Sequence, residues 1–291
     1  MDAMNAIKIV GLKKTYKTGT QALKGVDLTI EAGSITALLG ANGAGKTTLI
    51  AILTGIVNKS SGTVSVFEHD IDSSPQDVRS MIGVVPQEFN FNIFEKVEDI
   101  VINQAGYYGV PRDRARVRTE FLLKELGLLE KRHAVSRTLS GGMKRRLMIA
   151  RALVHEPKLL LLDEPSAGVD VELRLGMWEF IRKIHAAGTT VILTTHYLEE
   201  AENLCENVVI MKKGEIVKTG AVKVLLRDAK EQSFVVTVVR PSGAEEIVDV
   251  SLTDGQSVTD YVQKLAADGT TVRDIRPKAN RLEELFLEVN S

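Results

Sequence analysis

Short apolar runs alternate with longer segments of helical spacing over roughly the first 220 residues of the chain. The runs at residues 35–39 and 159–162 are continuously apolar, which is typical of strands buried on both faces of a parallel sheet. Helical spacing follows at 143–155 and 171–187, and each of these segments is followed by a residue that ends helices, proline or glycine. Strands and helices that alternate on this scale predict an α/β fold with parallel crossovers.

The pattern changes twice along the chain. Between about residues 88 and 138, apolar residues recur at helical spacing, which predicts a helical insertion between two halves of the sheet. We therefore predict a large domain at residues 5–220, with this insertion inside it, and a small α+β domain at residues 221–291. For the small domain the pattern predicts strands at 233–239, 246–250 and 272–275, and helices at 258–265 and 281–289.

Composition excludes several classes of protein. The 291 residues carry a net charge of −1, so no overall field draws the chain to nucleic acid. Cys205 is the only cysteine, which excludes a disulfide framework within the chain. No apolar run approaches the ~20 residues that span a bilayer, and residues 1–5 lack the basic and then apolar order of a signal peptide. We expect a soluble chain, and any membrane role must come through a partner.

The segment after the apolar run at 35–39 carries the strongest chemical signal. It matches the pattern of Gly, four residues, Gly, Lys and then Ser or Thr, between a strand and a helix, which is the context that a phosphate-binding loop needs. Lys46 would reach the β- and γ-phosphates, and the Thr47 hydroxyl would hold Mg²⁺. A Gly-rich turn without a ligand leaves the Lys-Thr pair unexplained. The predicted phosphate-binding residues are Gly40, Ala41, Asn42, Gly43, Ala44, Gly45, Lys46, Thr47 and Thr48.

An acidic pair, Asp163 and Glu164, ends the four-leucine run at 159–162. Ligands of open α/β sheets gather outside the carboxyl ends of the strands, so Asp163 is expected beside the phosphate loop as a Mg²⁺ ligand. Glu164 would then polarise a water for attack on the γ-phosphate. The alternative is an acidic pair that caps a helix before Pro165.

Three further residues are candidates by position. Gln87 and His196 each follow an apolar run, so both belong at the same edge of the sheet. A Gln amide can accept from a water and coordinate a cation, and a His can donate to a γ-phosphate. Tyr16 precedes a turn near the N-terminus and can stack on a base. Each of the three, taken alone, is more often a surface or structural residue.

Ser140, Gly141 and Gly142 form a second helix start without bulky side chains. Such a start offers N–H donors and a hydroxyl to an anion. Two anion-binding helix starts in one chain, far apart in sequence, predict either two ligands or one ligand that is shared between two copies.

The set Gly40–Thr47, Gln87, Leu139–Met143, Leu159–Glu164 and His196, in this order and spacing, resembles the nucleotide-binding subunit of ATP-binding cassette (ABC) transporters. The resemblance covers roughly residues 5–220 and favours functional roles for Gln87 and His196. It implies a P-loop NTPase core of the ABC ATPase type, with a mixed sheet and a helical subdomain. It also implies ATP and Mg²⁺ as cofactors.

The resemblance implies roles for several single residues. Tyr16 resembles the aromatic residue that stacks on adenine, and Gln87 joins Thr47 and Asp163 as a Mg²⁺ ligand. Asp170, which the resemblance implies is an ATP-binding residue, belongs to the segment 166–170, which resembles a loop that crosses the dimer interface. Ser140, Gly141 and Gly142 resemble the family's signature segment, which clamps the γ-phosphate of the ATP bound to the other subunit. Many members carry Gln where this chain has Met143 and Thr where it has Ser166, but neither departure changes a phosphate ligand.

Within the family, residues 139–147, 196–202 and 280–286 resemble ATPases of ABC-2-type exporters. This implies a homodimer of ATPase subunits, peripheral on the cytoplasmic face of the inner or plasma membrane, that pairs with a separate ABC-2-type transmembrane permease subunit. The exported substrate would be a drug, polysaccharide or lipid, and no nucleic acid partner is expected. The apolar residues Phe89, Phe91, Ile93 and Phe94 are expected either to receive the membrane subunit or to pack in the core.

Two other functions use the same phosphate loop. A soluble ABC ATPase that acts on the ribosome, DNA or an assembly scaffold is the first, but such proteins often carry two cassettes, a long coiled coil or a dedicated scaffold. This chain has one cassette, no heptad run and no basic tail. The second is a kinase or another P-loop enzyme, which leaves Ser140–Gly142 and His196 unexplained.

Overall fold

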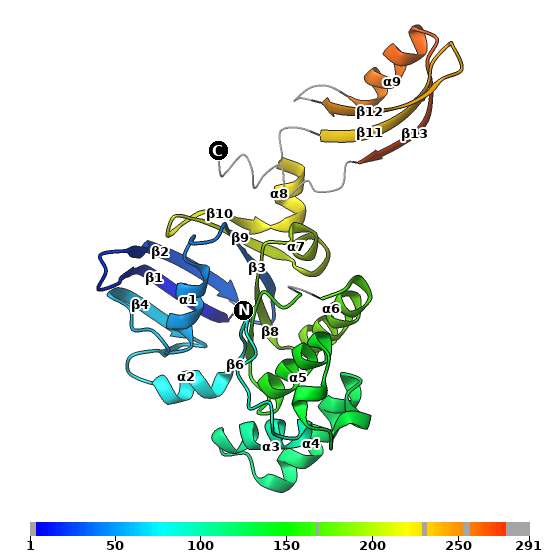
Figure 1. Ribbon diagram of the computed structural model, residues 1–291. Coiled ribbons are helices and arrows are strands. Elements are labelled where there is room, and N and C mark those ends of the chain that lie inside the picture. Colours follow the sequence, from blue (N-terminus) through cyan, green and yellow to red (C-terminus); the bar gives the residue numbers. More distant parts are fainter. Residues whose placement is uncertain (1–3, 167–168, 229–231, 253–256, 278–291) are drawn as a thin grey trace. The chain divides into compact units, whose positions relative to one another are not determined.

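The computed structural model describes residues 4–166, 169–228, 232–252 and 257–277. Its internal contacts divide the chain into two compact units, residues 1–219 and 220–291, and Figure 1 shows the elements of each. Within the described ranges, no helix is both long enough and apolar enough to cross a bilayer.

The first unit is built on a six-stranded sheet whose strand order is β10-β9-β3-β8-β7-β6. Neighbours from β9 to β6 pair in parallel, and β10 follows β9 through a tight turn at Lys213 and Gly214, with φ of 49° and 86°. This mixed sheet confirms the predicted fold class. Its strands are β3 (Ile35–Leu39), β6 (Ile82–Val85), β7 (Leu159–Asp163), β8 (Thr190–Thr195), β9 (Asn207–Lys212) and β10 (Glu215–Ala221).

A second, four-stranded sheet of order β2-β1-β4-β5 covers one side of this unit. Its strands are β1 (Asn5–Thr15), β2 (Gln21–Glu31), β4 (Ser61–Val66) and β5 (His69–Asp70). Helix α1 (Lys46–Leu53) packs between the two sheets, because Leu49 and Ile52 share one buried cluster with Leu12 of β1 and Leu161 of β7. This core holds the start of α1, and therefore the phosphate loop before it, in a fixed place.

Helices form the rest of the first unit. Figure 1 shows α3, α4 and α5 grouped together, apart from the antiparallel sheet. Helix α3 packs against both α4 and α5, while α5 reaches back to β6 of the parallel sheet. The helices are α2 (Pro75–Met81), α3 (Val97–Tyr107), α4 (Arg112–Glu125), α5 (Gly141–Leu153), α6 (Val171–Ala186) and α7 (Leu198–Leu204), with short 3₁₀ turns η1 (Leu129–Lys131) and η2 (Ser136–Thr138).

The second unit contains an antiparallel sheet of order β12-β11-β13. Val236 and Val238 of the central strand form its buried core together with Val250. Its elements are α8 (Val222–Asp228), β11 (Gln232–Val239), β12 (Glu245–Leu252), α9 (Val258–Ala267) and β13 (Thr271–Pro277). The helix that we predict at 281–289 lies outside the described residues.

His155, just after α5, connects the group of helices α3, α4 and α5 (the helical group) to the parallel sheet. Its Nε2 donates to the Ile82 carbonyl at 3.1 Å, and its ring stacks on Tyr108 with the centroids 3.6 Å apart. Burial lowers the pKa of His155 to about 4, while the hydrogen bond to Ile82 opposes this change in part. The ring is therefore neutral in the folded chain at neutral pH.

This pKa predicts an acid-sensitive contribution to stability. Between pH 6.5 and about 4 the unfolded chain binds a proton at His155 that the folded chain does not bind, so the free energy of unfolding falls as pH falls through this window. We expect the parent to lose about 2 kcal/mol more than His155→Phe between pH 7.5 and 4.5. Phe keeps an aromatic ring against Tyr108 but cannot titrate. Urea unfolding at both pH values measures the difference, and equal losses would contradict the assignment.

Candidate nucleotide-binding site

The parallel sheet brings four strand ends together. Strands β3, β8, β7 and β6 are neighbours in this order, with Leu39 opposite Thr195, Asp163 opposite Thr194 and Val85 opposite Leu162. Parallel strands end at the same edge of a sheet, so the segments that follow them share that edge. This register explains why Lys46, Gln87, Asp163, Glu164 and His196, which are far apart in sequence, form one cluster.

The phosphate loop is a turn that requires glycine at two positions. A Cβ at Gly40 would lie 2.6 Å from the Met211 carbonyl oxygen. Gly45 has a φ of 109°, and a Cβ there would lie 2.8 Å from the Ala22 carbonyl oxygen. Any side chain at either position would collide with backbone. The loop therefore lies close against β2 and β9, and Gly45 is the N-cap of α1.

Lys46 crosses this loop from the first position of α1. Its Nζ donates to the carbonyl oxygens of Gly40 at 2.6 Å and Ala41 at 3.2 Å. Burial lowers the pKa of Lys46, and the nearby carboxylates of Glu164 and Asp163 oppose that shift. The loop, its cation and the two acidic side chains are therefore close enough to interact electrostatically.

Glu164 occupies an unusual backbone conformation. Its φ is 48°, in the left-handed region that non-glycine residues rarely adopt. The Glu164 N–H donates to both the carbonyl oxygen and the Oγ1 of Thr194, at 3.1 and 3.0 Å, which holds this conformation in place. Strained backbone of this kind concentrates at functional sites.

The carboxylate of Glu164 meets two other predicted site residues. Gln87 Nε2 donates to Oε2 at 3.0 Å, and His196 Nδ1 lies 3.3 Å from Oε1. The carboxylate is largely buried, with 13% of the side chain exposed, while His196 is half exposed. Glu164 does not cap a helix, because Asp170 is the N-cap of the next helix, α6. A carboxylate held from both sides beside a phosphate loop is suited to orient a water.

The oxygen ligands available here suit Mg²⁺. Thr47 offers a hydroxyl, Asp163 a carboxylate and Gln87 an amide oxygen, all hard ligands of the type that Mg²⁺ prefers. Asp163 is oriented by Thr194, whose Oγ1 donates to its Oδ1 at 2.5 Å. Within the described part of the chain, no three His, Cys, Asp or Glu side chains are grouped to hold a metal ion. Mg²⁺ typically combines one or two carboxylates with waters and substrate phosphate oxygens, and the ligands offered here suit that mode of binding.

Tyr16 lies beside the phosphate loop. Its hydroxyl is 3.2 Å from Oγ1 of Thr48, and the Lys14 ammonium lies 5.0 Å from the centroid of its ring. The side chain is exposed to 37%. The position next to Thr48 is compatible with the predicted stacking on a base.

The second helix start belongs to α5. Ser140 is its N-cap and accepts from the Met143 N–H at 3.3 Å. A Cβ at Gly142 would lie 2.5 Å from Cδ1 of Leu173 in α6, whereas a Cβ at Gly141 would meet nothing within 4 Å. Gly142 therefore permits the contact between α5 and α6, while Gly141 faces open space.

Asp170 has a structural contact in the described chain. Its Oδ1 accepts from the Leu173 N–H at 2.9 Å, which caps α6. The predicted nucleotide contact of Asp170 is compatible with this position but is not part of the cluster around Glu164. Two neighbours of Asp170 in the 166–170 loop, residues 167 and 168, lie outside the described residues.

Sequence reasoning missed two residues that contact this site. Thr194 orients Asp163 and the Glu164 backbone, and a threonine at the end of a strand beside β7 was the available signal. Arg145 of α5 donates from Nη1 to the Pro86 carbonyl and from Nη2 to the Gln87 carbonyl, both at 2.8 Å. Nothing in the sequence pattern indicates these contacts between residues that are nearly 60 positions apart.

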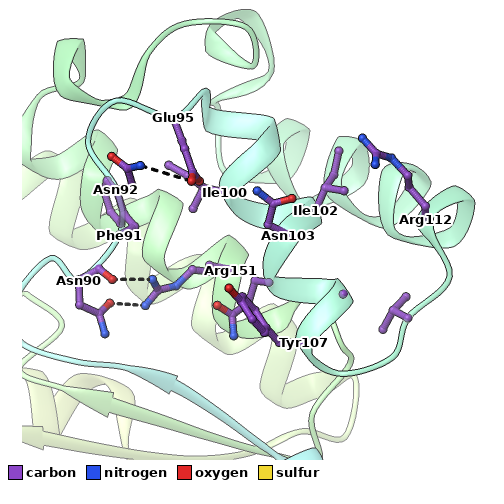
Figure 2. Close-up of a pocket in the computed structure, with 13 residues that line it drawn as sticks. Asn90, Phe91, Asn92, Glu95, Ile100, Ile102, Asn103, Tyr107, Arg112 and Arg151 are labelled. Atoms are coloured by element: carbon purple, nitrogen blue, oxygen red, sulfur yellow. Dashed lines mark hydrogen bonds between the residues drawn. The ribbon is translucent and has the colours of Figure 1, made fainter.

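A groove opens between the segment after Gln87 and α3. Figure 2 shows Asn90 and Arg151 joined by hydrogen bonds, with Tyr107 beside them, in a cavity of about 670 Å³. A second cavity of about 870 Å³ shares Asn90, Gln104, Tyr107 and Arg151 with the first. The two cavities are thus parts of one groove.

Several aromatic and aliphatic side chains that are next in sequence to residues lining this groove are exposed. The exposed fractions are 68% for Phe94, 43% for Phe89 and 43% for Ile93. Tyr107, which lines both cavities, is 86% exposed. Phe91 is half-buried, lines the first cavity and has its ring 6.2 Å from that of Phe89. Of the two expectations for this patch, core packing does not describe Phe89, Ile93 and Phe94.

Known proteins are similar to this chain in both sequence and fold. The profile of a family described as "ABC transporter" matches residues 23–167. The daunorubicin/doxorubicin resistance ATP-binding protein DrrA of Streptomyces peucetius is 36% identical over 94% of this chain and 79% of its own length. The Nod factor export ATP-binding protein I of Burkholderia lata is 39% identical over 70% of this chain and 67% of its own length.

Two solved structures extend the comparison to the fold. The cbiO1 protein of Clostridium perfringens, part of the ABC transporter complex cbiONQ, is 34% identical and has a TM-score of 0.70 over 77% of this chain and 91% of its own. A dimeric ATP-binding cassette in a post-hydrolysis state, bound to ADP and Pi, is 27% identical with a TM-score of 0.68 over 74% of this chain and 98% of its own.

Proposed function

Because this chain belongs to the ABC transporter family, as an ATP-binding and ATP-hydrolysing subunit of the exporter type, we propose that it works as a head-to-tail homodimer around two ATP molecules. Each ATP would lie between the phosphate loop of one copy and Ser140–Gly142 of the other. The observation that supports ATP hydrolysis at this site is the contact of Glu164 with Gln87 and His196 beside Lys46.

The phosphate loop would bind the nucleotide. Lys46 is already aimed across the loop and would place its ammonium between the β- and γ-phosphates. Thr47 and Asp163, with Gln87, would hold Mg²⁺, which supplies positive charge to the phosphate oxygens. Tyr16 would stack on the adenine from beside Thr48.

Glu164 would act as the general base. A water held by its carboxylate attacks the γ-phosphorus, the bond from that phosphorus to the bridging β-oxygen breaks, and the proton of the water passes to Glu164. Gln87 and His196 would keep the carboxylate oriented toward the attacking water, and His196 can also donate to a γ-phosphate oxygen. Lys46 stabilises the negative charge that develops on the phosphates.

Two features support a site that needs a second copy. The N-terminus of α5 offers backbone N–H groups and the Ser140 hydroxyl to an anion, and Gly141 leaves the approach open. Asp170 lies at the start of α6, which contacts Gly142 through Leu173. We propose that closure of the dimer brings both segments against the partner's ATP, and that hydrolysis reopens it.

The groove beside Asn90 and Tyr107 would receive a separate ABC-2-type permease subunit on the cytoplasmic face of the membrane. Tyr107 and Arg151 line this groove and Phe94 is exposed one residue before the lining residue Glu95, so the surface offers both apolar and polar side chains to a helix of mixed character. The names of the relatives indicate drug resistance in one case and export of a Nod factor in the other. We propose that this chain also serves export of an organic molecule such as a drug, polysaccharide or lipid, which the permease selects.

Affinity purification of the tagged chain from detergent-solubilised membranes tests the partner. We expect one polytopic membrane protein to co-purify and to raise the rate of ATP hydrolysis. Recovery of ribosomes, DNA or a soluble scaffold instead would support the soluble ABC ATPase and overturn the exporter.

The groove itself can be tested by substitution. We expect Phe94→Ala combined with Tyr107→Ala to lower transport in reconstituted vesicles about tenfold, because exposed aromatic anchors of this kind contribute most of the energy of an interface. ATP binding by the isolated subunit should stay within a factor of about two, since neither side chain lies at the strand ends. Val117→Ala, at an exposed position on α4 outside the groove, is the matched control. Parental transport by the double variant would exclude this docking surface.

A further inference from the structure

Arg145 is a buried cation that the mechanism above does not use. It lies on α5, five residues after Ser140, and is only 5% exposed. Burial lowers the pKa of its guanidinium, while the negative charges of Asp163 and Glu164 oppose the shift. A charge is not buried at this depth without partners that compensate for its lost hydration.

The partners of Arg145 are consecutive main-chain carbonyls. Nη1 donates to Pro86 and Nη2 to Gln87, each at 2.8 Å, and the guanidinium carbon lies 5.3 Å from the ring centroid of Phe89. The two carbonyls follow β6 directly. Arg145 therefore holds the backbone of Gln87 on one side while the Gln87 side chain holds Glu164 on the other.

These contacts form a continuous connection from one end of the cluster to α5. Glu164 contacts the amide of Gln87, the Gln87 main chain contacts Arg145, and Arg145 is on the same helix as Ser140 and Gly141. A shift of Gln87 would thus be transmitted to the start of α5 through two charge-assisted hydrogen bonds.

We propose that Arg145 is a positioning residue that couples the two ATP sites of a dimer, by linking Gln87 at one site to the Ser140–Gly142 segment that closes the other. The inference rests on the proposed function in one respect, namely that each ATP lies between the phosphate loop of one copy and Ser140–Gly142 of the other. A guanidinium holds both carbonyls through two nitrogens in one rigid plane, whereas a lysine ammonium is a compact donor on a flexible stem and would fix their positions less firmly.

The neighbouring residue provides a matched control. Arg146 donates from Nη1 to the Leu126 carbonyl at 2.8 Å, within the helical group and away from Gln87. Arg145 and Arg146 each have a buried Nε without a hydrogen-bond partner among the described residues, so they resemble each other in chemistry, although Arg146 as a whole is half-buried. They differ in which segment they hold.

A double-mutant cycle on the full chain tests the coupling. Arg145→Lys and Arg146→Lys are made alone and in a Gln87→Ala background, and kcat and KM for ATP hydrolysis are measured. We expect Arg145→Lys to lower kcat about tenfold with KM changed less than about twofold, and to have almost no further effect once Gln87 is Ala. The effect of Arg146→Lys should be the same in both backgrounds.

Phe89→Leu is a milder second variant that keeps the guanidinium and both carbonyl bonds. Because Phe89 is 43% exposed, this change should fold even if Arg145→Lys does not. We expect it to lower kcat about threefold, in proportion to the lost contact between cation and ring, and again only when Gln87 is present.

The outcomes separate the inference from the function on which it rests. If the parent hydrolyses ATP and Gln87→Ala is impaired, but Arg145→Lys or Phe89→Leu costs the same factor in both backgrounds, the coupling role of Arg145 is wrong and the proposed function stands. If Gln87→Ala hydrolyses ATP at the parental rate, the roles of Gln87 and of Arg145 both fail.

Discussion

Glu164→Gln is expected to lower kcat for ATP hydrolysis by a factor of about 10² to 10³, within the range that a positioned general base contributes. The amide has nearly the same shape as the carboxylate and can still contact Gln87 and His196, so the site should keep its geometry. It cannot accept the proton of the attacking water. ATP binding should therefore persist, and the variant should accumulate as an ATP-bound dimer.

Three measurements check this result. Phosphate release gives kcat, calorimetry with ATP and Mg²⁺ gives the dissociation constant, and size-exclusion chromatography gives the oligomeric state with and without ATP. Glu199→Gln is the matched control, because Glu199 lies on α7 three residues after His196 and its carboxylate pairs with Arg174 on the surface. Hydrolysis by Glu164→Gln at the parental rate would remove Glu164 from the role of base.

Gly141→Glu is expected to abolish hydrolysis for a different reason, with a loss of at least about 10² in kcat. A Cβ at this position meets nothing within 4 Å, so the single chain should fold and melt as the parent does. The new carboxylate would stand at the α5 start, where the partner's γ-phosphate is proposed to bind, and would repel it. Binding of ATP to the Lys46 site of the isolated chain should be unaffected.

The signature of this effect is loss of the dimer rather than of the nucleotide. When Gly141→Glu is added to Glu164→Gln, the ATP-dependent dimer should disappear while ATP still binds. Gly106→Glu provides the control, because a Cβ at Gly106 on α3 also meets nothing within 4 Å. A stable ATP-bound dimer of the Gly141→Glu, Glu164→Gln chain would contradict the shared site.

The parts of the fold that sequence could predict are those with an internal pattern. The bounds predicted for β3 agree with the structure and those for β7 differ by one residue, since short apolar runs between turn signals leave little choice of bounds. The cluster of Lys46, Gln87 and Glu164 was also predictable, because parallel strands end at one edge of a sheet. That rule needs only the strands and the residues that follow them.

Other features depend on contacts that no local pattern encodes. The left-handed conformation of Glu164 is set by Thr194, on a neighbouring strand. The reach of Arg145 to Pro86 depends on how α5 packs against the end of β6. The groove beside Tyr107 exists only because α3 is placed next to the segment after Gln87. Such features require the tertiary arrangement itself.

At position 164 the residue proposed to be needed for ATP hydrolysis is not the residue that would give the most stable backbone. A residue other than glycine at φ 48° costs on the order of 1 kcal/mol, so a glycine there would relax the chain while removing the proposed general base. Screens that reward thermal tolerance alone would therefore favour the loss of Glu164. An effort to make this ATPase more robust should hold position 164 constant and seek its gains elsewhere.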